Sequence, residues 1–128
     1  MESMLRTMHE HEGRAPAAEI ADVIHPDCQM RLLVSFGKLL RGREAVLEAL
    51  EAGRQAAIFR ADVDRFEWLD ETTVLTFARA RYALEKGGHA EGRVVWLDQV
   101  REGLIWRVQA FRQEEDARSA YAAMRREV

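Results

Sequence analysis

From Ala61 onward, hydrophobic and polar residues alternate in four long runs that are separated by turn-forming residues. Such alternation is typical of β-strands with one buried face. The connections Glu85-Lys86-Gly87-Gly88 and Arg101-Glu102-Gly103 favour hairpins, because glycine tolerates positive φ. The pattern therefore predicts an antiparallel meander whose four strands cover residues 61–69, 74–84, 92–100 and 104–112.

The residues before this meander follow helical spacing. Residues 2–12 give a weak amphipathic pattern, and residues 17–24 give a second, short one. This second helix should stop at His25-Pro26-Asp27, because the residue before a proline disfavours the helical region. The strongest helix begins after Gly42, with Glu44 in the first turn, where the helix dipole favours an anion.

Two further segments complete the prediction. Cys28 to Leu40 is expected to be extended in two pieces, with a turn at Phe36-Gly37-Lys38. Residues 114–126 are an amphipathic helix that docks either on the domain or on a partner subunit. The fold class is therefore α+β: a curved antiparallel sheet forming a cone or roll around a pocket, covered by N-terminal helices and one long helix. The length predicts a single domain over residues 1–128.

Four short motifs accompany this order of elements. They are His25-Pro26-Asp27, Gly42-Arg43-Glu44-Ala45-Val46, Arg101-Glu102-Gly103-Leu104-Ile105 and Val108-Gln109-Ala110-Phe111. Together they resemble the nuclear transport factor 2-like (SnoaL-like) superfamily over about residues 15–121. The resemblance implies a cystatin-like cone around a ligand-sized pocket. Members include isomerases, dehydratases, cyclases, epoxide hydrolases and non-enzymatic binding proteins, so the fold does not by itself give an activity.

The composition of the chain limits the kinds of partner that we expect it to bind. A net charge of -3 and a pI near 5.8 argue against a nucleic-acid partner, which would need a basic face. No run of about 18 apolar residues is present, so we expect no membrane partner. The single cysteine, Cys28, cannot form an internal disulfide, which favours a cytoplasmic protein. The richness in alanine, arginine and glutamate suggests a GC-rich genome and hence a bacterial source. We find no metal-binding or phosphate-loop motif, and therefore predict no cofactor.

Asp98 is the candidate catalytic residue. On its strand it shares a face with Val94 and Trp96, while Val95 and Leu97 point the other way. If the first face lines the cone, Asp98 is a carboxyl in an apolar pocket. Burial disfavours the charged form of such a group and suits it to general acid or base catalysis. If no cation lies nearby, Asp98→Asn should stabilise the protein.

Two alternatives concern the same region. The ketosteroid isomerases of the superfamily need a base on the first strand and an acidic donor. The resemblance places Leu32 at the position of the base and Trp96 near that of the donor. Leucine cannot abstract a proton and an indole N–H is a weaker donor, so isomerase chemistry of that kind is excluded.

If the strand faces are reversed, Arg81 pairs with Asp98, as in the arginine–aspartate sets of epoxide hydrolases.

The inner face of the sheet is expected to line a ligand pocket. The predicted lining residues are Met30, Leu32, Tyr82, Trp96, Asp98, Val108 and Ala110, with Arg112 at the mouth and His25 near the rim. An ordinary role for His25 is to bond a backbone carbonyl at a helix end. Cys28 is expected to be a small buried apolar residue. The tract His9-Glu10-His11-Glu12 is predicted to be a solvated charged helix, because its histidines face different directions.

Apolar residues on the opposite face predict a homodimer. Leu75, Phe77, Val95 and Leu97 would form a patch too large to leave in water. The leading hypothesis is a homodimeric cone that binds a small, largely apolar molecule. Asp98 would then serve an isomerase, dehydratase, cyclase or hydrolase. The alternative is a non-catalytic ligand-binding or dimerisation module. A second titratable side chain within hydrogen-bond reach of Asp98 would favour the enzyme.

Overall fold

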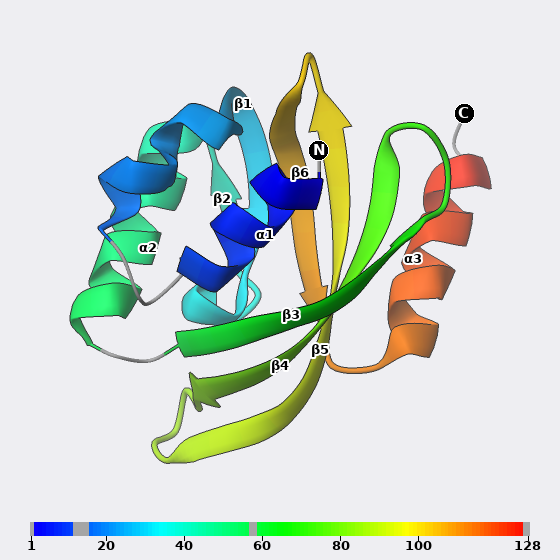
Figure 1. Cartoon of the computed structure of the whole chain (residues 1–128). Helices are drawn as coiled ribbons and strands as arrows, with labels where there is room; N and C mark the ends of the chain where they lie inside the picture. The colour runs from blue at the N-terminus through cyan, green and yellow to red at the C-terminus, as the bar shows by residue number, and fades with distance from the viewer. Residues whose placement is uncertain (1, 12–15, 57–58, 127–128) are drawn as a thin grey trace.

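Six strands form one strongly curved, unclosed sheet with helices on both sides (Figure 1). The structure is a computed structural model, which describes residues 2–11, 16–56 and 59–126. The strand order is β2-β1-β6-β5-β4-β3, and only β1 and β6 pair in parallel. This is the predicted α+β class. No helix within the described ranges is long and apolar enough to cross a membrane.

The element bounds follow the sequence pattern closely in the second half of the chain. In order they are α1 (Glu2–His11), η1 (Ala17–Val23), β1 (Ile24–Arg31), η2 (Leu33–Ser35), β2 (Leu39–Arg41), α2 (Arg43–Gln55), β3 (Phe59–Trp68), β4 (Thr73–Ala83), β5 (His89–Arg101), β6 (Leu104–Phe111) and α3 (Glu114–Arg126). The predicted meander is β3 to β6. Its last turn has positive φ at both Glu102 and Gly103, as a tight two-residue hairpin needs.

The prediction was wrong around His25-Pro26-Asp27. The preceding helix is a 3₁₀ helix, η1, and the three residues belong to β1 and not to a helix end. The pairing of β1 with β6 shifts register between Ile24 and Gln29. An irregularity of this kind accommodates proline inside a sheet, because proline cannot donate a ladder hydrogen bond.

Helix α1 covers the concave side of the sheet and docks on β3, which is an edge strand (Figure 1). Its apolar side chains Leu5 and Met8 are completely buried. Val63 of β3 donates its N–H to the Glu10 carboxylate at 2.9 Å, and its carbonyl accepts from Arg6 at 3.0 Å. These two side chains satisfy backbone groups that an edge strand would otherwise expose. Glu12, the predicted end of this helix, lies outside the described residues.

Helix α3 covers the opposite, convex side of the sheet, which corrects the predicted dimer interface. Leu75, Val95 and Leu97 are buried against Ala117 of α3, and Phe77 is partly buried beside them. The helix is held by the Arg118 guanidinium, which donates to both oxygens of Glu67 at 2.8 Å and lowers the pKa of that carboxyl. The predicted interface is wrong, because the same chain already covers this apolar patch.

Candidate functional site

A small group of polar and aromatic side chains is buried on the concave face of the sheet, beneath α1. It consists of Asp98 and Trp96 of β5, Thr76 of β4 and His9 of α1, and we call it the concave-face centre. All four side chains are 0% exposed. The expectation that Asp98 and Trp96 face inward therefore agrees with their burial in this structure.

One oxygen of Asp98 is held by two neighbours. His9 Nε2 lies 2.8 Å from Asp98 Oδ2, and the Thr76 hydroxyl donates to the same oxygen at 2.7 Å. When the carboxyl is ionised it only accepts, so His9 then carries its proton on Nε2. The His9 ring is stacked on Trp96, with ring centroids 4.0 Å apart and an interplanar angle of 17°. Phe59 meets the edge of the same indole at 6.1 Å.

Two side chains of β5 in this centre, Asp98 and Trp96, each have a polar atom without a hydrogen-bond partner among the described residues. These atoms are Asp98 Oδ1, an acceptor, and Trp96 Nε1, a donor, and both are buried. A buried polar atom without a partner costs about 1–3 kcal/mol, so most proteins avoid one. The two residues stand two positions apart on β5 and share its concave face. Together they offer one donor and one acceptor to a small polar group.

His9 was missed by the sequence prediction, which placed its tract in solvent. The signal was present: Leu5, Met8 and His9 have spacings of three and four, so they lie on one face of a helix. The two histidines of the tract do differ in environment, since His9 is fully buried and His11 only partly so.

The predicted lining residues fall into two groups. Met30, Leu32 and Val108 are buried in the same core cluster as Trp96. The register sets Asp98 opposite Val108 and Val108 opposite Met30, so these side chains form one row across β5, β6 and β1. Ala110 lies opposite Trp96 and packs against this cluster as a partly buried residue.

The second group lies around a pocket of about 610 Å³ at the end of β6. β6 pairs with β5 only from Val95 onward, so the edge of β5 is open at Val94. Tyr82 and Arg112 both line this pocket, and the Arg112 guanidinium lies 5.2 Å from the centre of the Tyr82 ring.

Ala78 and Val94 also line this pocket, and they are the cross-strand pair next to Thr76 and Trp96. At Ala78 and Val94 the pocket is one row from the concave-face centre. Most of its other lining residues lie on the convex face or at the start of α3, among them Phe77, Val95 and Glu114.

Solved structures resemble this arrangement of sheet and helices over most of the chain. A protein of unknown function from Burkholderia pseudomallei, described as nuclear transport factor 2-like, superposes with a TM-score of 0.68 and covers 90% of this chain and 92% of its own. The two sequences are 15% identical. The chain has the nuclear transport factor 2-like fold. The resemblance inferred from the sequence motifs is thus confirmed at the level of the fold.

Other structures share this nuclear transport factor 2-like fold. A candidate polyketide cyclase from Sinorhizobium meliloti has a TM-score of 0.70 at 13% identity, with 87% of this chain and 95% of that one covered. A Mycobacterium tuberculosis protein in complex with estradiol-17β-hemisuccinate has a TM-score of 0.65 at 13% identity, with 88% and 94% covered. No protein-family model and no curated protein sequence matches the chain.

Two predicted polar residues lie apart from the concave-face centre. His25 accepts a hydrogen bond from the Asp27 N–H at 3.0 Å, and its Nε2 is 3.2 Å from Glu102 in the last hairpin turn. It stands five positions before Met30 on β1, roughly 15 Å along the strand. Cys28 is buried as expected, and burial raises its pKa to about 11, which leaves an unreactive thiol.

The alternative pairing of Arg81 with Asp98 is wrong. Arg81 is exposed and alternates with the buried Ala80 and Tyr82, so it points to the convex side while Asp98 points to the concave side. The partner of Asp98 is a histidine and not an arginine. Within the described part of the chain, no three histidine, cysteine, aspartate or glutamate side chains are grouped to hold a metal ion.

Proposed function

We propose that this protein binds a small, largely apolar molecule against the concave face of its sheet and moves a proton on it with Asp98. The observation that carries the proposal is the geometry around this carboxyl. Its Oδ2 is fixed by His9 and Thr76, while its Oδ1 has no partner within the described residues and lies beside the Trp96 indole. A carboxyl with one oxygen anchored and the other available is suited to act as a general base.

The proposed step breaks an acidic C–H bond next to a ligand carbonyl. Asp98 Oδ1 takes the proton, and the electron pair of the C–H bond moves into an enolate. The carbonyl oxygen thereby gains negative charge, and the Trp96 N–H donates a hydrogen bond to it, as a weaker donor than the acid of the ketosteroid isomerases. The base is Asp98 on β5, and not a residue of the first strand as in those enzymes. The proton then returns to carbon at the same or another position, which completes the transfer. His9 holds the carboxyl in place through Oδ2.

Ligands of similar structures support the proposed chemical class. The Mycobacterium tuberculosis protein was crystallised with a steroid ester, and another similar protein, TerC, with polyporic acid. TerC has a TM-score of 0.65 and 18% identity to this chain. We propose that this chain also takes a flat, mostly apolar molecule that carries a few oxygen atoms.

The pocket at the end of β6 is the proposed route to the concave-face centre. Along β5, Val94, Trp96 and Asp98 are successive inward positions, and the pocket reaches the first of them. Two residues of a strand span about 7 Å, so Trp96 lies one such step beyond the pocket and Asp98 two. Ala78 on β4, which has a small side chain and lies opposite Val94, is beside this proposed route. Arg112 stands at the entrance beside Tyr82.

Deuterium exchange into 2-tetralone tests the proposal, because this flat ketone has acidic C–H bonds and needs no knowledge of the natural substrate. In D₂O at neutral pH, the wild-type protein should exchange these positions faster than buffer. Asp98→Asn should lower the protein-catalysed rate about 10²–10⁴-fold. Trp96→Phe, which keeps the ring but removes the N–H, should lower it about 10²-fold. Asp22→Asn, at an exposed position, is the matched control and should leave the rate unchanged.

A non-catalytic binding protein is the second candidate, and the complete burial of Asp98, His9 and Trp96 favours it. In that case the centre only supports the core, and ligands stop in the pocket beside Tyr82. 2-Tetralone would then bind, detected by its effect on NMR signals of pocket residues, without any exchange above buffer. Binding without exchange would therefore contradict the proposed proton transfer and support a non-catalytic binding protein.

A further inference from the structure

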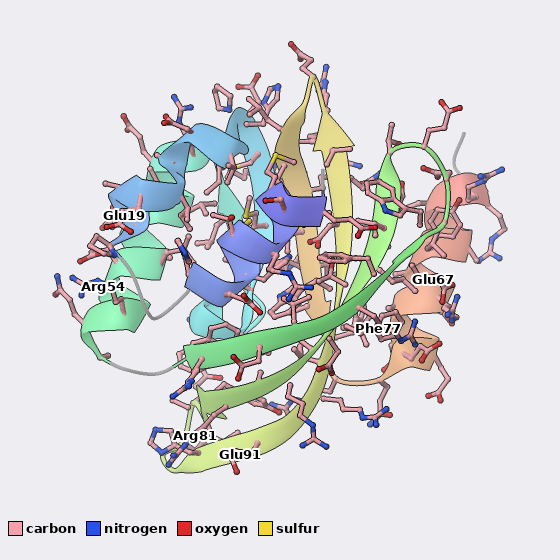
Figure 2. All side chains as sticks on the ribbon, viewed as in Figure 1. Glu19, Arg54, Glu67, Phe77, Arg81 and Glu91 are labelled. Carbon is pink, nitrogen blue, oxygen red and sulfur yellow. The ribbon has the colours of Figure 1, made fainter. Side chains whose placement is uncertain are left out.

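Four exposed arginines lie together on the part of the convex face that α3 leaves open. They come from three neighbouring strands, β3, β4 and β5, and they are Arg60, Arg79, Arg81 and Arg93. Figure 2 labels Arg81 near the end of the β4–β5 hairpin, far from α3 and next to Glu91. We call these four side chains the arginine band. The concave-face centre makes no use of them.

The strand register arranges the band as an unbroken diagonal. Residues directly opposite one another form two adjacent rows across the three strands. The first row is Arg60, Arg81 and Glu91, and the second is Asp62, Arg79 and Arg93. The two carboxylates therefore occupy opposite corners of the grid. The four guanidinium groups run between these corners from β3 to β5.

Arg60 and Arg93 each have an arginine as their only directly opposite neighbour. β3 is an edge strand, so Arg60 meets only Arg81. β6 does not pair with β5 before Val95, so Arg93 meets only Arg79. Like charges directly opposite each other destabilise a sheet. The directly opposite residue therefore does not stabilise arginine at either position.

The band is also uncompensated by ion pairs. Within the described ranges, none of its four arginines has a carboxylate oxygen within ion-pair distance or a side-chain hydrogen bond. By contrast, Arg118 on the same face binds both Glu67 and Glu114. Within the grid, four guanidinium groups against two carboxylates leave a local excess of positive charge in a protein whose net charge is -3. Arg93 also lines the pocket at the end of β6, together with Asp64, Glu114 and Glu115.

A hollow of about 370 Å³ opens on this band. Arg60, Arg79 and Arg81 line it together with the carboxylates of Asp62 and Glu91, and Arg93 is not among its lining residues. Guanidinium groups bind phosphate oxygens through paired hydrogen bonds. We infer that the arginine band is a second ligand site, which binds a small phosphorylated molecule through its phosphoryl group. An elongated dianion fits the diagonal, whereas the carboxylates at the corners limit the length of the anion.

Titration with pyrophosphate at constant ionic strength tests this inference, with isothermal calorimetry to measure affinity. Pyrophosphate should bind at one site with millimolar or better affinity. Arg60→Gln and Arg93→Gln should each weaken binding about fivefold, because each removes one charge-assisted contact at an exposed position. Arg126→Gln, on the last turn of α3, makes the same charge change away from the band and should leave the affinity unchanged.

A thermal melt without pyrophosphate distinguishes a ligand site from a structural role. Arg60→Gln and Arg93→Gln should leave the melting temperature unchanged or raise it by about 1–3 °C, because each relieves a like-charge contact. A marked fall in melting temperature would show that the arginines support the fold. Absence of pyrophosphate binding, or equal weakening by Arg126→Gln, would also overturn the inference. Arg60 does not line the pocket at the end of β6, so the result for Arg60→Gln is independent of the proposed proton transfer at Asp98.

Discussion

Asp98→Leu is expected to lower the free energy of unfolding by about 2–5 kcal/mol, because each of the two buried polar groups left without a partner costs about 1–3 kcal/mol. The leucine would leave the Thr76 hydroxyl and His9 Nε2 without their shared acceptor in a region that is 0% exposed. Chemical denaturation at neutral pH measures the change. Asp22→Leu, at an exposed position, is the control and should change stability by no more than about 0.5 kcal/mol.

A double-mutant cycle separates this interaction from simple loss of packing. His9→Leu alone should also be strongly destabilising. The double variant His9→Leu/Asp98→Leu should cost at least about 2 kcal/mol less than the sum of the two single changes, because neither polar group is then left unpaired. Additive costs would mean that the two side chains do not interact in solution. The prediction that Asp98→Asn stabilises the protein assumes that no cation lies near the carboxyl. It stays a prediction, because His9 Nε2, 2.8 Å away, is a cation only when it is protonated.

Leu5→Ala is expected to lower the free energy of unfolding by about 2–4 kcal/mol, which is the usual cost of deleting a buried leucine side chain. Leu5 is 0% exposed and belongs to the main core cluster, although it sits on the first helix of the chain. The measurement reports whether α1 covers the concave face in solution. Ser3→Ala, on the exposed side of the same helix, should have little effect.

A small effect of Leu5→Ala, comparable to that of Ser3→Ala, would contradict this placement of α1. It would also remove the protein cover from Asp98, because His9 is carried on the same helix. The chemistry proposed for the concave-face centre depends on its exclusion from water, so this stability measurement bears directly on the function.

The meander and the facing of Asp98 could be predicted because alternation in a strand is a local signal. Val94, Trp96 and Asp98 are alternate residues of one strand, so their side chains lie on the same face of the sheet. If one of them is expected to be buried, the other two are expected to be buried as well. The 3₁₀ helix and the early start of β1 could not be read in this way. There, Pro26 favours a break in any regular element, and only the pairing of β1 with β6 makes the segment a strand.

The chemistry of the site depends on contacts between distant segments, which local patterns do not contain. His9 and Asp98 are 89 positions apart, and their contact follows from the docking of α1 on the edge of β3. Thr76 reaches Asp98 because of the register between β4 and β5. The prediction of a dimer interface was wrong for the same reason. The apolar patch was correctly located on one face of the sheet, but the helix that covers it comes from the end of the same chain.

A crystal structure of the protein with 2-tetralone tests the central claim most directly. If Asp98 transfers a proton on the ligand, the ketone should lie on the concave face beyond Ala78 and Val94. Its oxygen should be within hydrogen-bond distance of Trp96 Nε1, and an acidic carbon should be near Asp98 Oδ1. A ketone that stays beside Tyr82, with the centre still closed between α1 and the sheet, would contradict the account.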